Sequence, residues 1–510
     1  MSVEPEVVSA GDAGSAAGDL RAVARGGAAN LLGSIITGVA IFAMTVLVTR
    51  TLPRDSAGVF FTSTSLFLLV TAVGQLGTTT GVVYFVARAR ALHVAGSIPG
   101  LVRTALVPVV GVGLVATVVA LVAAHPVAHL VAGSHADQAV VYIRVLGVFV
   151  PLAGAEAVWL AAMRGFGSMR VNAVVELVGR PLLQLGLVAI ALTTASAGWI
   201  GLTWGAPYAA AAAAAYLFWS RTATCLRAGG EVAGVTSGEF WRFTGPRAVT
   251  SVIQVLMQRF DIVLVGALAG VVQAAVYAAA TRFIVVGQMA VTAFTQATQP
   301  RLSHTLARED RGGTNQIYQL STAWLILLTW PLYLTLLIFR APLLQVFGHG
   351  YETGGAVLVW LSLSMLVATG CGLVDVVLSM AGHTSWNLVN AAGALTCNIV
   401  LDLLLIPGHG VLGAAIGWSA AICLRNLAAA TQVGLALRLH PVARSTVLAA
   451  LLTLTAFGLV PWLLQQVLGD GWTGLAAACV VGTVLLVAGT VTAHQTFHLR
   501  AFGFRVPQRA

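Results

Sequence analysis

Away from the ends of its long apolar stretches, this sequence carries ten charged residues, and charge is otherwise scarce there. They are Arg144, Arg180, Arg259, Arg282 and Arg425, with Glu156, Glu176, Asp261, Asp375 and Asp402. An arginine at the centre of a bilayer costs about 2.5–3.5 kcal/mol on insertion scales, so such residues normally face water, a charged partner or a ligand. Guanidinium groups bind phosphate oxygens in bidentate geometry. The ten residues therefore indicate either a cavity that binds a diphosphate or a set of interhelical ion pairs.

Two of the apolar stretches carry a polar stripe along one helical face. At 100° per residue, five polar residues of the stretch 244–268 fall within an arc of about 80°. They are Arg247, Ser251, Gln254, Gln258 and Asp261. The stretch 271–299 repeats the pattern with Thr281, Gln288, Thr292, Thr295, Gln296 and Gln299, and a milder version contains Asn30, Ser34 and Thr37. Such stripes line either a watery cavity or an interhelical hydrogen-bond seam.

Roles can be assigned to these residues if the stripes line a cavity. Arg282 lies at the margin of its stripe, and Arg259 points roughly 120° from the centre of its own. We predict a substrate-binding set of Arg247, Arg259, Arg282, Gln254, Gln258, Gln288, Gln296, Asn30 and Ser34. We predict that Asp261 and Asp375 bind a coupling ion, a proton or sodium. For Asp261 the equal alternative is a counter-ion for an arginine. Glu176 and Arg180, four residues apart, predict a structural ion pair.

The elements that position these residues must cross a membrane. The chain has 510 residues, of which 58% are hydrophobic and 9% charged, a composition that excludes a disordered chain and a small disulfide-rich domain. Fourteen apolar stretches are each long enough to cross the hydrocarbon as a helix. They run at 26–50, 57–86, 99–124, 139–163, 171–194, 199–220, 244–268, 271–299, 319–339, 356–381, 386–406, 412–437, 445–466 and 472–494. The fold class is therefore an all-α polytopic membrane protein.

The arginines outside these stretches set a topology. Nineteen lie in loops and tails on one predicted side and three on the other. Arginine-rich loops face the cytoplasm, so both termini are predicted to be cytoplasmic. Most of the net charge of +10 then reflects topology, and we expect no nucleic-acid partner. The five cysteines and the histidines show no metal-ligand spacing, so we expect no metal and no cofactor.

An internal repeat divides the spans. Residues 51–60, TLPRDSAGVF, resemble residues 268–277, LAGVVQAAVY, at an offset of 217. An offset that contains six spans predicts two parallel six-helix bundles around a central cavity, plus two extra C-terminal helices. We predict a disordered cytoplasmic tail at 1–25, bundles at 26–220 and 244–437, a cytoplasmic linker at 221–243, the extra helices at 445–494 and a tail at 495–510.

Three segments carry a resemblance to a known family. Residues 25–61 (RGGAANLLGSIITGVAIFAMTVLVTRTLPRDSAGVFF), 74–91 (GQLGTTTGVVYFVARARA) and 380–419 (MAGHTSWNLVNAAGALTCNIVLDLLLIPGHGVLGAAIGWS) resemble polysaccharide transporters, the O-antigen-type oligosaccharide flippases. This family forms part of the multidrug/oligosaccharidyl-lipid/polysaccharide exporter superfamily. The resemblance covers the first twelve spans and extends to the total of fourteen.

The resemblance implies a transporter rather than an enzyme. Its two bundles would form a V that alternates between inward and outward openings and turns over a sugar linked to polyprenyl diphosphate, in the cytoplasmic membrane, for surface polysaccharide assembly. Membrane lipid would be a partner, as would glycosyltransferases or a polymerase of the cell envelope. The alternatives are a lipid II flippase, a cation-coupled multidrug exporter, a membrane glycosyltransferase or polymerase, and a structural scaffold.

Overall fold

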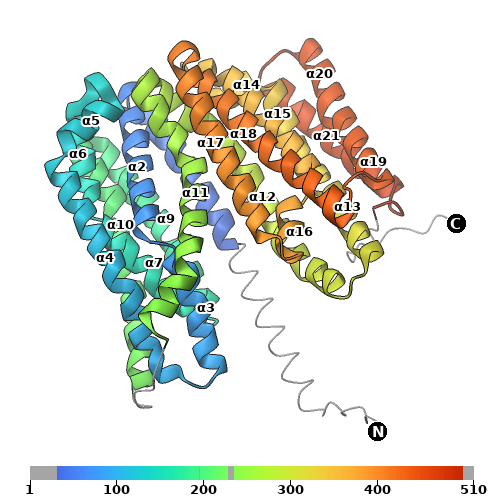
Figure 1. The fold of residues 1–510 in the computed structure, drawn as a ribbon. Coiled ribbons are helices and arrows are strands. Elements are labelled where there is room, and N and C mark those ends of the chain that lie inside the picture. Colours follow the sequence, from blue (N-terminus) through green and yellow to red (C-terminus); the bar gives the residue numbers. More distant parts are fainter. Residues whose placement is uncertain (1–31, 195, 228–234, 498–510) are drawn as a thin grey trace, which may run out of the picture. The chain divides into compact units, whose positions relative to one another are not determined.

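The computed structural model describes residues 32–194, 196–227 and 235–497, whose regular secondary structure is helical throughout (Figure 1). The predicted tail at 1–25, most of the tail at 495–510 and the predicted site residue Asn30 lie outside these ranges. Thirteen helical segments in them are long and apolar enough to cross a membrane. This confirms the all-α membrane class, although the segments do not follow the predicted boundaries everywhere.

In the first half of the chain, several predicted spans are divided into shorter helices. In order, the helices of this half are Leu32–Thr51, α2 (Arg54–Gly74), α3 (Thr78–Ala91), α4 (Ile98–Val122), α5 (Ala124–Ala132), α6 (Ala136–Gly147), α7 (Val150–Gly165), α8 (Met169–Asn172), α9 (Arg180–Ala191) and α10 (Ala197–Arg227). A π-helical segment, Ala173–Gly179, joins α8 to α9. The helix α10 covers the predicted span 199–220; its tryptophans, tyrosines and alanines make it less apolar than the thirteen.

The second half contains the two longest helices, α11 and α12. Its helices are α11 (Ser237–Ala269), α12 (Val271–Ala307), α13 (Arg311–Ile338), α14 (Arg340–Gln345), α15 (Gly355–Gly370), α16 (Val374–Met380), α17 (Thr384–His409), α18 (Val411–Gln432), α19 (Arg444–Thr453), α20 (Val460–Leu468) and α21 (Trp472–Thr492). With 33 and 37 residues, α11 and α12 extend well beyond the apolar stretches that predicted them.

The predicted span 57–86 is wrong as one helix, because the backbone turns between α2 and α3. Leu76 and Gly77 have φ values of 50° and 68°, in the left-handed region that ends a helix. A Cβ atom on Gly77 would lie 2.5 Å from the Cα atom of Ala248, so glycine is also required for the close approach of α11. Hydropathy continues across this turn, which is why a hydropathy count joins the two helices.

The chain forms two compact units. The first comprises Met1–Ala43, Val70–Ala120 and Val145–Ala248, and the second Met44–Leu69, Leu121–Arg144 and Val249–Ala510. The core of the first contains Phe85, Trp219 and Phe240, from α3, α10 and α11. In the second, α17 lies along α18, where a Cβ atom on Gly413 would sit 2.5 Å from the carbonyl carbon of Leu405 (Figure 1). The predicted pair of six-helix bundles stays a prediction.

Candidate functional site

Two buried carboxyl groups meet in the second unit. Asp261 on α11 is 3% exposed and Asp402 on α17 is fully buried, and the two carboxyl groups lie within hydrogen-bonding reach of each other. The hydroxyl of Tyr277 on α12 donates to Oδ2 of Asp261 at 2.8 Å. The amide of Asn398 donates to Oδ2 of Asp402 at 3.1 Å. Each carboxyl group thus has one oxygen satisfied by a protein donor.

The other oxygen of each carboxyl group gives the site its chemistry. Oδ1 of Asp261 and Oδ1 of Asp402 are buried and accept a hydrogen bond from no donor within the described ranges. Two carboxylates in contact repel each other unless a proton or a cation lies between them. The site can therefore hold one proton, or a small hard cation such as sodium that prefers oxygen ligands. Across the described parts of the chain, no three His, Cys, Asp or Glu side chains gather as metal ligands.

Close helix packing makes room for Asp402. A Cβ atom on Gly417 of α18 would lie 2.3 Å from Oδ1 of Asp402. Asn398 and Asp402 are four residues apart and share one face of α17. The sequence predicts Asp261 as an ion-binding residue and Asp402 only as a charge within a span. The spacing of an amide and a carboxylate four residues apart in an apolar helix was the signal that could have added Asn398 and Asp402.

The second predicted ion-coupling residue, Asp375, has a cationic partner. It lies on α16, and its Oδ2 accepts from Nη2 of Arg425 on α18 at 2.5 Å. Both side chains are partly exposed, at 38% and 29%. A carboxylate neutralised by an arginine has less need of a coupling ion, so this geometry favours a structural role for Asp375. An ion-coupling role for Asp375 stays a prediction.

Two arginines of the predicted substrate set lie close together. Arg282 on α12 is 6% exposed, and its Nε donates to the carbonyl oxygen of Ala278 at 3.1 Å. Its guanidinium group is within electrostatic reach of the guanidinium of Arg259 on α11. No carboxylate of the described residues lies within 4.0 Å of Arg282. A buried cation beside a like charge favours an anionic ligand, because the anion would offset both desolvation and repulsion.

The residues of the polar stripe on α11 lie in different environments. Gln254 and Gln258 are exposed, whereas Asp261 is buried against α12 and α17. Arg247 is exposed and folds back along its own helix, where Nη1 donates to the carbonyl oxygen of Phe243 at 2.8 Å. The guanidinium carbon lies 3.7 Å from the centre of the Phe243 ring. On α12, Gln296 is exposed and Gln288 is half-buried, and Ser34 on the first helix is half-buried. Their role as a cavity lining stays a prediction.

The charges of the first unit pair differently from the prediction. Glu176 lies 3.6 Å from Arg164, and Arg180 lies 3.7 Å from Glu156. The expected ion pair between Glu176 and Arg180 is not the shortest contact of either residue, although the charge of Glu176 still acts on Arg180. The guanidinium of Arg180 also lies 4.5 Å above the ring of Tyr208. These contacts account for the four charges as an interhelical network.

Known proteins share both the sequence and the fold of this chain in part. The family model MatE matches residues 246–404, the region that contains both the carboxyl pair and the arginine pair. The structure of the lipid II flippase MurJ in an inward closed conformation matches with a TM-score of 0.70 and 11% identity, over 91% of this chain and 98% of that one. The chain has the fold of MurJ. No curated protein sequence matches the chain.

Two further structures have the same fold. An inward-facing multidrug resistance MATE family transporter of the MOP superfamily matches with a TM-score of 0.60 and 15% identity, over 77% of this chain and 92% of that one. A MOP superfamily transporter from Pyrococcus furiosus Vc1 (DSM3638), described as having a binding pocket of reverse polarity, matches with a TM-score of 0.56 and 15% identity. It covers 80% of this chain and 94% of that one. These likenesses establish a MATE- and MurJ-like fold, whereas the polysaccharide transporter family stays a prediction.

Proposed function

We propose that the protein is an alternating-access transporter that flips a polyprenyl-diphosphate-linked oligosaccharide across the cytoplasmic membrane. The observation that carries this proposal is the proximity of Arg259 and Arg282 on α11 and α12, with Arg282 buried away from any described carboxylate. A membrane protein that keeps a desolvated cation there has a use for it, since arginine is among the costliest residues at mid-depth. Translocation needs no covalent chemistry, and the solved structures of this fold are described as transporters or a flippase.

A diphosphate suits the arginine pair better than a drug cation does. Two guanidinium groups can share the oxygens of one diphosphate in bidentate geometry, and the anion would remove the repulsion between them. A cationic drug would add a third positive charge. A lipid II flippase is a close alternative, because lipid II also carries its sugar on a polyprenyl diphosphate. A multidrug exporter is a less favoured alternative, and a glycosyltransferase is the least favoured of the three.

The carboxyl pair supports coupling to a proton or sodium. Arg259 and Asp261 are two residues apart on α11, which places them about 200° apart around the helix axis. One helix would thus carry an anion-facing arginine on one side and an ion-binding carboxyl group on the other. A shift or rotation of α11 that follows ion binding at Asp261 and Asp402 would move Arg259 with it. This is the simplest mechanical link between the two sites.

The test uses the purified protein in liposomes with a fluorescent polyprenyl-diphosphate-linked sugar. Flipping is measured as the fraction of the sugar that becomes accessible to a membrane-impermeant reagent. We expect Arg282→Ala to reduce the rate at least tenfold. Arg144→Ala is the matched control, because Arg144 is also an arginine of an apolar stretch but is exposed. Equal rates for Arg282→Ala and the wild type, or export of cationic dyes that the diphosphate does not inhibit, would contradict the proposal.

A further inference from the structure

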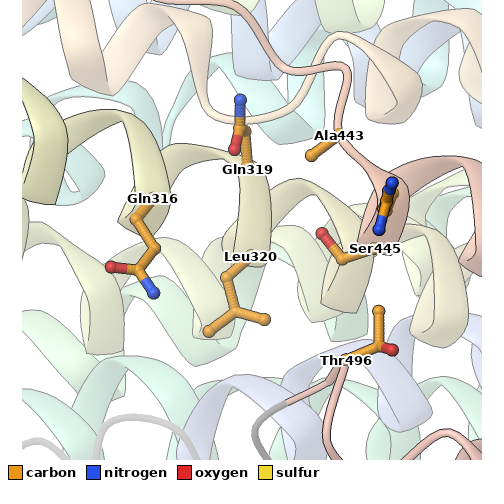
Figure 2. Close-up of a pocket in the computed structure, with 7 residues that line it drawn as sticks. Gln316, Gln319, Leu320, Ala443, Ser445 and Thr496 are labelled. Carbon is orange, nitrogen blue, oxygen red and sulfur yellow. The ribbon is translucent and has the colours of Figure 1, made fainter.

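A polar cavity lies where α13 and α19 begin, and its lining includes no residue of the carboxyl or arginine pairs (Figure 2). It has a volume of about 260 Å³. Its lining comprises Gln316, Gln319 and Leu320 of α13, Ala443, Arg444 and Ser445 at the start of α19, and Thr496 beyond α21. Three segments that are distant in the sequence therefore contribute amide, hydroxyl and guanidinium groups to one space, and none of its described lining residues is acidic.

Arg444 and the first turn of α19 supply hydrogen-bond donors to the cavity. Arg444 is exposed and forms no ion pair with a described residue. The helix α19 starts at Arg444 after Ala443, and the side chain of Ala443 cannot cap its first turn. The N–H groups of an uncapped first turn carry a partial positive charge and favour an anion. Arginine, helix terminus and hydroxyl groups together match the oxygens of a phosphate.

The cavity is held in shape by contacts that do not involve Arg444. The amide of Gln319 donates to the carbonyl oxygens of His440 and Val442, at 3.3 and 3.4 Å. The backbone N–H of His440 donates to Oδ1 of Asn315 at 3.0 Å. These bonds fasten the segment before α19 to the first turns of α13. Arg444 is therefore presented by a fixed backbone rather than by a loose loop.

Apolar residues adjoin the lining residues along the chain. Phe497, just beyond Thr496, is fully buried in a cluster with Ala323, Ile326 and Ala449. Val442, Val447 and Leu451 are exposed. A free phosphate would use only the polar groups, whereas an amphiphile would also cover the exposed apolar side chains. Basic pockets between the ends of membrane helices are typical sites for anionic lipid headgroups.

We propose that this cavity binds the headgroup phosphate of an anionic phospholipid, with the acyl chains beside α19. The site shares no residue with the carboxyl and arginine pairs and does not depend on the proposed function. The lipid would fasten α19, the first of the two extra C-terminal helical spans, to α13. Inorganic phosphate offers the same oxygens without the chains, so the experiment must separate the two.

The test measures lipid retained by the full-length protein. The protein is purified from nanodiscs that contain equal phosphatidylglycerol and phosphatidylcholine, and bound lipid is counted by native mass spectrometry. We expect preferential retention of phosphatidylglycerol, weakened about fivefold in Arg444→Ala, since one arginine near an anionic surface contributes about 1 kcal/mol. Ser445→Asp should weaken retention as well, although an acid in the first turn stabilises a helix. This second variant separates a lost ligand from a lost fold.

Arg438→Ala is the matched control, because Arg438 is an exposed arginine of the same connection that does not line the cavity. We expect it to retain phosphatidylglycerol as the wild type does. Equal losses in Arg438→Ala and Arg444→Ala would show general interfacial charge and overturn the proposal. Retention unchanged in Arg444→Ala and Ser445→Asp would also overturn it. Millimolar inorganic phosphate that binds the wild type without any lipid preference would identify a free-phosphate site instead.

Discussion

Replacing Asp402 with asparagine should stabilise the protein while removing the ion dependence of transport. In Asp402→Asn, the new side-chain amide can donate to the carboxyl group of Asp261, whose Oδ1 is buried without a donor among the described residues. The substitution would also remove one of two like charges in contact. A buried acceptor without a donor costs about 1–3 kcal/mol, so we expect the free energy of unfolding to rise by about that amount. The variant resembles the site with its proton permanently in place.

Two measurements check this prediction. Thermal unfolding in detergent should show a higher midpoint for Asp402→Asn, and flipping in liposomes should no longer respond to an imposed proton or sodium gradient. Asp375→Asn is the matched control, because it replaces a carboxylate of the same unit whose partner is Arg425. We expect this control to lower stability by about 1 kcal/mol, as for a partly exposed ion pair, and to retain the gradient response.

Either of two results would contradict the prediction for Asp402→Asn. A lower unfolding midpoint for Asp402→Asn would mean that the carboxylate has a cationic partner that the geometry does not provide. A gradient response equal to that of the wild type would mean that the coupling ion binds elsewhere. If Asp261→Asn lost protein from the membrane and regained it when Arg259 was neutralised as well, Asp261 would be a counter-ion.

Three further changes have expected outcomes. Gly417→Ala should lower the free energy of unfolding by about 1–3 kcal/mol, because its Cβ atom would lie 2.3 Å from Oδ1 of Asp402. Gly393→Ala on α17 is the control: its Cβ atom meets no atom within 4 Å, so the thermal unfolding midpoint should not change. Tyr277→Phe removes the donor to Asp261 and should cost about 1–3 kcal/mol; an unchanged midpoint would mean that water replaces the hydroxyl. Arg282→Lys should restore only part of the flipping lost in Arg282→Ala, because lysine presents a point charge rather than a fork; full rescue would argue against bidentate binding of phosphate.

The sequence was most informative where one physical constraint acts on a whole segment. Hydropathy predicted a helical bundle with about fourteen spans, because every backbone amide in hydrocarbon must be satisfied within its own segment. It failed between α2 and α3, where Leu76 and Gly77 turn the chain without any change in hydropathy. It also set α11 and α12 too short, since their polar ends continue the helices past the apolar stretch.

The sequence by itself determined which charged residues carry a desolvation cost large enough to require a structural or functional role. Asp261, Arg259 and Arg282 stood out because a charge in an apolar stretch carries a large desolvation cost wherever the chain folds. Only the tertiary structure decided which charged residues are partners. It places Asp402 of α17 beside Asp261, more than a hundred residues away in the sequence, and it pairs Asp375 with Arg425. Pairing depends on which helix faces approach and at what depth, and small residues such as Gly417 set that approach. The desolvation cost of a charged side chain can be estimated from that residue alone. Its neutralisation needs a second residue, and the packing of the helices determines which residue that is.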